Sequence, residues 1–96
     1  MASYRILCWR EIPSLVEAFE GGREVRRPLS PRFQELIDAV AMREGASDTE
    51  SYLEGWAHGP DLERPGGPEE VAEAVAAELE SGFPALAARR LSSPTG

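Results

Sequence analysis

The sequence predicts a small α+β domain, an antiparallel sheet packed on one face by two or three amphipathic helices. Two observations indicate this class. Residues 1–28 are rich in β-branched and aromatic side chains and contain a Gly-Gly pair typical of a hairpin turn. Residues 31–91 instead repeat apolar side chains at helical spacing. The 96 residues suffice for one domain with one core, which we place at residues 1–91, with 92–96 as a flexible tail.

Residues 3–12 predict a first, central strand because they hold β-branched and aromatic residues and no glycine. Pro13 is expected to end it, since proline cannot donate a ladder hydrogen bond. Alternate side chains then line opposite faces, with Tyr4, Ile6 and Cys8 on one and Leu7 and Trp9 on the other.

Residues 14–20 and 23–28 predict a β-hairpin closed by Gly21-Gly22, because two glycines supply the positive φ angles of a two-residue turn. This register places Glu20 opposite Arg23 and Glu17 opposite Arg26, two pairs of opposite charge. A helical start over residues 14–19 stays open as an alternative, because it would gather Leu15, Ala18 and Phe19 on one side.

The next segment predicts a long helix. Ser30 can cap it, Pro31 suits its first position, and Gly45 closes its far end. Its apolar side chains recur at the spacing of one buried stripe, formed by Phe33, Leu36, Ile37, Val40 and Ala41.

Ser47 and Glu50 match a capping box and predict a short helix that runs to about Trp56. Its inward side chains are expected to be Tyr52, Leu53 and Trp56. Residues 57–67 are punctuated by glycine and proline and leave room for one short edge strand at most.

A last main helix is predicted between Pro68 and Gly82. Its buried side is expected to hold Val71, Ala72, Val75 and Leu79, and its wet side Glu69, Glu70, Glu73 and Glu80. Residues 84–91 add a further helical turn or two with Leu86 and Leu91.

Charge and composition restrict the function. All ten basic residues are arginine and face 17 acidic ones, for a net charge of -7, which disfavours nucleic acid and anionic membranes as partners. The chain shows no apolar run of membrane-spanning length and no signal peptide, and its one cysteine cannot form an internal disulfide. We therefore expect a cytoplasmic protein.

The candidate chemical groups do not form a complete site. His58 is expected to be an exposed loop histidine, and Cys8 a structural residue of the central strand. No metal-ligand or nucleophile motif accompanies them, so we expect no cofactor and no metal, and an enzyme is less favoured than a binding protein.

Arginine and tryptophan carry the candidate binding surface. Arg26, Arg27 and Arg32 flank the junction between the hairpin and the first helix, where they can converge on a helix N-terminus. Internal pairing with Glu17, Asp38 or the acidic helices is the equally favoured alternative. Trp9 is more often a core residue than a contact, but beside Arg10 it has the composition of an interface hot spot. The predicted partner-binding residues are Trp9, Arg10, Arg26, Arg27 and Arg32.

Five motifs in order resemble the small bacterial virulence factor domain family. They are Trp-Arg-Glu-Ile-Pro at 9–13, Arg-Pro-Leu-Ser-Pro-Arg-Phe-Gln at 27–34, Ile37-Asp38 with Ala41-Met42, Tyr52-Leu53 with Trp56, and Pro-Glu-Glu-Val-Ala at 68–72. The resemblance spans residues 3–82 and implies a domain that occurs alone or joined to helical repeats. It supplies no reaction and no catalytic residue.

These observations predict a non-catalytic accessory or protein-interaction domain. Its partner is expected to be another protein, an acidic one if the arginines converge. The alternative is a small-anion or cofactor-binding subunit of a larger enzyme, which the resemblance links to folate or corrinoid one-carbon metabolism through neighbouring genes.

Overall fold

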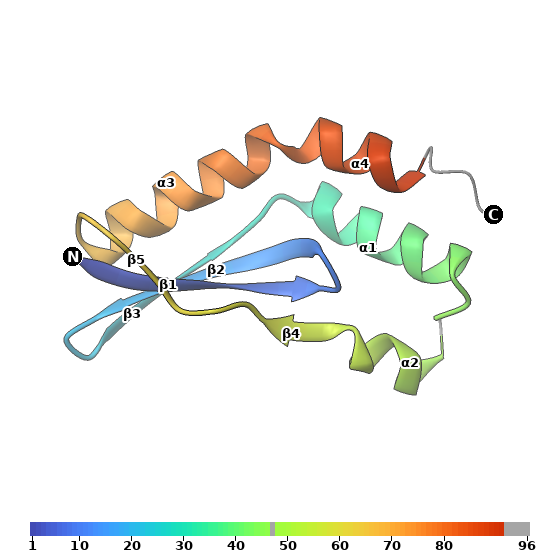
Figure 1. Cartoon of the computed structure of the whole chain (residues 1–96), viewed down its shortest axis with the longest axis horizontal. Coiled ribbons are helices and arrows are strands. Elements are labelled where there is room, and N and C mark those ends of the chain that lie inside the picture. The colour runs from blue at the N-terminus through green and yellow to red at the C-terminus, as the bar shows by residue number, and fades with distance from the viewer. Residues whose placement is uncertain (47, 92–96) are drawn as a thin grey trace.

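The computed structural model describes residues 1–46 and 48–91. Figure 1 shows a twisted sheet with helices packed along one side. The elements in chain order are β1 (Ala2–Trp9), β2 (Ile12–Glu20), β3 (Arg23–Pro28), α1 (Pro31–Arg43), α2 (Thr49–Glu54), β4 (Trp56–His58), β5 (Leu62–Arg64), α3 (Pro68–Ser81) and α4 (Phe83–Leu91).

The sheet is antiparallel and five-stranded, with β1 and β2 in its middle. Its order is β3-β2-β1-β4, and β5 pairs with β1 along the same edge as β4. Helix α3 packs on β2 and β3, α1 packs on β2, and α4 packs on α1 and α3. The predicted α+β class is therefore confirmed.

The first strand is shorter than predicted. It ends at Trp9, and Arg10 and Glu11 form the turn to β2, so Pro13 lies inside the second strand instead of ending the first. Arg10 adopts a positive φ of 54° there, and its N–H donates to the Gly55 carbonyl at 2.7 Å. The register shifts between Leu7 and Cys8, and this irregularity accommodates Pro13 opposite Cys8.

The hairpin of β2 and β3 is confirmed with the predicted register. Gly21 and Gly22 have φ angles of 56° and 88°, and Glu20 and Glu17 lie opposite Arg23 and Arg26. The helical alternative for residues 14–19 is wrong, because the pairing with β1 extends the segment along its whole length.

Helices α1 and α3 form as predicted, and the stripe on α1 is buried at all five positions. On α3, however, Leu79 is only half-buried, and Glu80 is half-buried instead of lying on the wet side. The cap of α1 differs in one respect. The Ser30 side chain makes no capping bond within its own helix, because its N–H and hydroxyl both donate to the Glu80 carboxylate, at 2.7 and 2.8 Å. Glu80 therefore caps α1 from the end of α3.

The region after α1 departs most from the prediction. Ser47 lies outside the described residues, and Asp48 caps α2 by accepting a hydrogen bond from the Ser51 N–H at 3.2 Å. The helix ends at Glu54, so Trp56 begins β4 instead, and Leu53 is 60% exposed rather than inward. Residues 57–67 hold most of β4 and all of β5, where we expected one strand at most.

The chain end agrees in part with the prediction. Helix α4 carries a buried Leu86, whereas Leu91 is exposed. The tail predicted for residues 92–96 lies outside the described residues. In the described part of the chain, no helix has the length and apolar character needed to span a bilayer.

Candidate functional site

One face of the sheet is packed by helices and the other is open. Directly paired residues share a face, so the pairing assigns each side chain. Val16 and Ala18 point to the helices and are fully buried. The opposite side, which we call the open sheet face, holds Ser3, Arg5, Leu7, Leu15, Glu17, Phe19, Glu24, Arg26, His58 and Glu63.

Glu17 lies at the centre of the open sheet face, yet it is only 1% exposed. Its carboxylate accepts a hydrogen bond from Arg5 Nε at 2.8 Å and pairs with Arg26 Nη2 at 3.2 Å. His58 Nε2 lies 3.1 Å from the same carboxylate. Side chains from β1, β3 and β4 therefore cover this carboxylate, and none of the described helices shields it.

The electrostatics of this cluster favour the ionised carboxylate. The hydrogen bond from Arg5 holds the pKa of Glu17 below its usual value, against the opposing effect of burial, and the charges of Arg5, His58 and Arg26 add to the lowering. The same hydrogen bond raises the pKa of the Arg5 guanidinium. Glu17 is thus a stable anion that pairs with two guanidinium groups on the open sheet face.

Half-buried apolar side chains frame the charged cluster. Leu7 lies opposite Leu15 on one side of it, and Phe19 lies on the other, next along β2 on this face. The Arg5 guanidinium carbon sits 5.7 Å from the centroid of the Phe19 ring. The open sheet face therefore combines half-buried apolar side chains with fixed charges.

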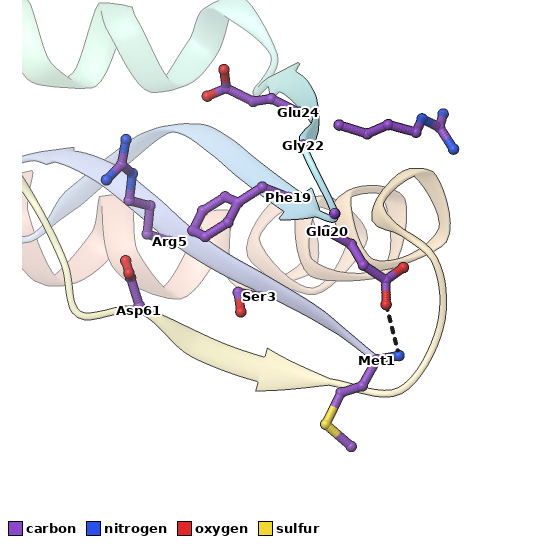
Figure 2. Close-up of a pocket in the computed structure, with 10 residues that line it drawn as sticks. Met1, Ser3, Arg5, Phe19, Glu20, Gly22, Glu24 and Asp61 are labelled. Atoms are coloured by element: carbon purple, nitrogen blue, oxygen red, sulfur yellow. Dashed lines mark hydrogen bonds and ion pairs between the residues drawn. The ribbon is translucent and has the colours of Figure 1, made fainter.

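A hollow of about 600 Å³ lies at the Phe19 end of the open sheet face. Figure 2 shows the Phe19 ring near its middle, with the side chains of Glu24 and Asp61 on opposite sides of the ring and the helices behind the sheet. The hollow is lined by Met1, Ser3, Arg5, Phe19, Glu20, Gly21, Gly22, Arg23, Glu24 and Asp61.

Comparison with known proteins identifies the family of this chain. A protein-family model described as virulence factor matches residues 7–91, which includes all the described helices and strands except the first five residues of β1. The chain belongs to the virulence factor family. Comparison with curated proteins and with solved structures gives no match. The resemblance noted in the sequence is thereby confirmed, and the family's description names no reaction.

In this virulence factor domain, Trp9 and Arg10 lie at the turn between β1 and β2. Trp9 is fully buried, donates its indole N–H to the Tyr52 carbonyl at 2.8 Å, and stacks on the Tyr52 ring at 5.9 Å. Arg10 covers the Trp9 ring at 4.6 Å and pairs with Glu44. The aromatic ring itself is therefore part of the core, and Arg10 forms its lid.

The three arginines at the hairpin–helix junction do not converge. Arg26 projects from the open sheet face and its side chain is 65% exposed. Arg27 turns to the helical side, where its Nε lies 2.6 Å from a Glu73 carboxylate oxygen. Arg32 pairs with Glu80 at 2.9 Å and stacks on Phe83 at 4.5 Å. Of the two readings, the described contacts show internal pairing, and the partner-binding role of these residues stays a prediction.

The sequence reasoning missed Arg5 and His58. Arg5 could have been found, because the antiparallel pairing of β1 with β2 brings it opposite Glu17, which was already predicted to face Arg26. His58 was expected in a loop, but it closes β4 and lies opposite Leu7. No local signal announces a three-residue edge strand, so its position could not be predicted.

Cys8 is a free, partly buried cysteine in β1. Burial raises the pKa of the Cys8 thiol, with a smaller contribution from Glu11, so the reactive thiolate is disfavoured. Among the described residues, no three His, Cys, Asp or Glu side chains are grouped so that they could hold a metal ion.

Proposed function

We propose that this virulence factor domain is a non-catalytic interaction module that binds another protein through its open sheet face. The single observation that carries the proposal is the lack of helix cover over Leu7, Leu15 and Phe19 within the described residues. An antiparallel sheet that faces water normally turns polar residues outward on that side. Apolar side chains that remain on such a side are instead typical of a surface that a partner covers.

The partner is a different protein rather than a second copy. Each chain carries a net charge of -7, so two copies repel one another at neutral pH. Among the predicted contact residues, Arg26 belongs to the open sheet face, whereas Arg27 and Arg32 contact acidic residues of α3. We therefore move the proposed binding surface to the open sheet face from the arginine rim, the name we give to the predicted contact residues Trp9, Arg10, Arg26, Arg27 and Arg32.

The state of the potential catalytic groups supports a non-catalytic role. A general base needs a pKa near the working pH, and that of Glu17 is lowered instead. A nucleophilic thiol needs a lowered pKa, and that of Cys8 is raised. The alternative of small-anion binding needs arginines free of carboxylates, and the pairing of Arg5, Arg27 and Arg32 does not favour it.

Site-specific photo-crosslinking in the cell of origin tests the binding surface. A benzophenone amino acid is placed at position 15 on the open sheet face, at position 32 on the rim, or at position 42, where Met42 is 73% exposed on α1. We expect one protein adduct from position 15 and none from position 42. An adduct from position 32 alone would return the binding surface to the arginine rim, and equal adducts from all three positions would refute a defined surface.

A further inference from the structure

We propose that the partner of the open sheet face contacts it with a basic segment, one of whose cationic side chains enters the hollow around Phe19. The inference rests on the proposed function, because it names the chemistry of the partner that covers this face. It reverses the polarity expected from the sequence, in which a cluster of arginines favoured an acidic partner.

Most of the arginines are paired with carboxylates within the described residues. Of the arginines that line the hollow, Arg5 is bonded to Glu17 and Arg23 pairs with Glu69 of α3. The terminal amino group of Met1 pairs with Glu20 at 3.1 Å. The positive groups at this end of the sheet are therefore already matched by internal carboxylates.

Some carboxylates around the hollow have no close cationic partner among the described residues. Within the described residues Asp61 makes no ion pair, although its charge acts on Arg5 through space, and the nearest Arg26 nitrogen is 3.9 Å from Glu24. Glu63, on the same face in β5, is also exposed. The lining holds as many cations as carboxylates, but Glu17 and Glu69 from outside it neutralise Arg5 and Arg23, which leaves Glu24 and Asp61 as exposed negative charges. The net charge of -7 also attracts a cationic partner from a distance.

The Phe19 ring lines the hollow together with these carboxylates. Glu24 and Asp61 lie on opposite sides of the ring in Figure 2, and all three residues line the hollow, so the hollow offers an aromatic ring together with two carboxylates. Aromatic faces attract guanidinium and ammonium groups, and the Arg5 guanidinium at 5.7 Å already uses this ring in that way. Charged donors also form the stronger hydrogen bonds to carboxylates. An arginine or lysine side chain fits this combination of ring and carboxylates.

The test follows amide chemical shifts of the full chain while acetyl-arginine-amide is added. Acetyl-citrulline-amide serves as the probe control, because it keeps the shape of arginine but carries no charge. We expect arginine to shift the amides of residues 19, 24 and 61, and citrulline to leave them unchanged. Equal effects of the two probes, or arginine shifts confined to other parts of the chain, would overturn the inference.

Variants of the two carboxylates sharpen the test. Asp61→Asn and Glu24→Gln are each expected to weaken arginine binding by about three- to fivefold, the range of one exposed charge pair. Glu35→Gln, at an exposed position of α1, is the matched control and is expected to bind as the wild type does. Unchanged binding by both variants, with well-dispersed spectra that show intact folds, would refute the proposed contacts.

The two proposals fail in different ways. If crosslinking places the partner on the open sheet face but Asp61→Asn and Glu24→Gln leave its affinity unchanged, the basic segment is refuted and the binding surface stands. If crosslinking places the partner elsewhere, the proposed function falls, whatever the arginine probe does.

Discussion

Glu17 is the residue on the open sheet face that Arg5, Arg26 and His58 all contact. Its carboxylate is buried, but both guanidinium groups that neutralise it are partly exposed, with side-chain exposures of 35% for Arg5 and 65% for Arg26. Removal of Glu17 therefore leaves two cations that water can solvate, and the cost stays below that of a fully buried pair.

The pH dependence of stability tests this arrangement. The folded-state pKa of Glu17 is lowered, so its contribution is complete above the ordinary value of 4.5 and is lost as the pH falls through the folded value. Glu17→Gln is expected to lower the free energy of unfolding by about 1–2 kcal/mol at pH 7. That deficit should shrink in urea titrations below pH 4.5.

Glu24→Gln, on the same face, is the control and should change the free energy of unfolding by less than about 0.5 kcal/mol. A Glu17→Gln deficit that stays constant between pH 7 and pH 3 would show that the charge of Glu17 contributes nothing to stability.

Gly55 is required by the buried Trp9 ring. A β-carbon at position 55 would lie 2.4 Å from Trp9 Nε1, and the indole is held in place by its hydrogen bond to Tyr52. We expect Gly55→Ala to lower the free energy of unfolding by about 1–3 kcal/mol in denaturant titrations, as overpacking does. Gly82→Ala, where a β-carbon meets only ordinary contacts at 3.6 Å, should be close to neutral, and equal effects would contradict this packing.

The β2–β3 hairpin is the element whose local sequence specifies it best. Gly21 has a φ of 56° with open space around its Cα, and asparagine is favoured over other side chains at this turn position. Gly21→Asn is expected to raise the free energy of unfolding by about 0.4–1 kcal/mol, because it restricts the unfolded chain. Gly21→Val should lower it, because a β-branched residue resists positive φ. Thermal melts that rank Val above Asn would be evidence against this turn.

Elements specified by short-range patterns were predictable, and those specified by distant contacts were not. Helices α1 and α3 follow from apolar periodicity, with Pro31 and Pro68 at their starts. The early end of β1 depends instead on Gly55, whose carbonyl accepts the Arg10 N–H. No pattern within β1 contains that information, so its end was predicted three residues too late.

The difference between short-range patterns and distant contacts also explains which residues of the candidate site could be predicted. The Glu17–Arg26 pair follows from the hairpin register and was predicted, whereas Arg5 and His58 join it through pairing with β1 and β4. The arginine rim was predicted from sequence proximity alone. Adjacent strand residues point to opposite faces, and for that reason Arg26 and Arg27 are separated by the sheet.

For the whole molecule, ion pairs within the chain determine which charged side chains remain unpaired at the surface. Acidic residues of α3 pair with Arg23, Arg27 and Arg32, so these arginines tie the hairpin and the start of α1 to that helix. The excess acids remain at the surface, and the sheet keeps one face without helix cover. The open sheet face therefore combines half-buried apolar side chains with exposed carboxylates, and the basic partner proposed above would cover it.

The most direct test of the binding surface is the dissociation constant of the purified partner, measured by calorimetry with three forms of the domain. Leu15→Ser removes apolar surface from the open sheet face without a change of charge, and Met42→Ser does the same at an exposed position of α1. We expect Leu15→Ser to weaken binding by about tenfold or more and Met42→Ser to leave it unchanged. Wild-type affinity in the Leu15→Ser domain would contradict the account.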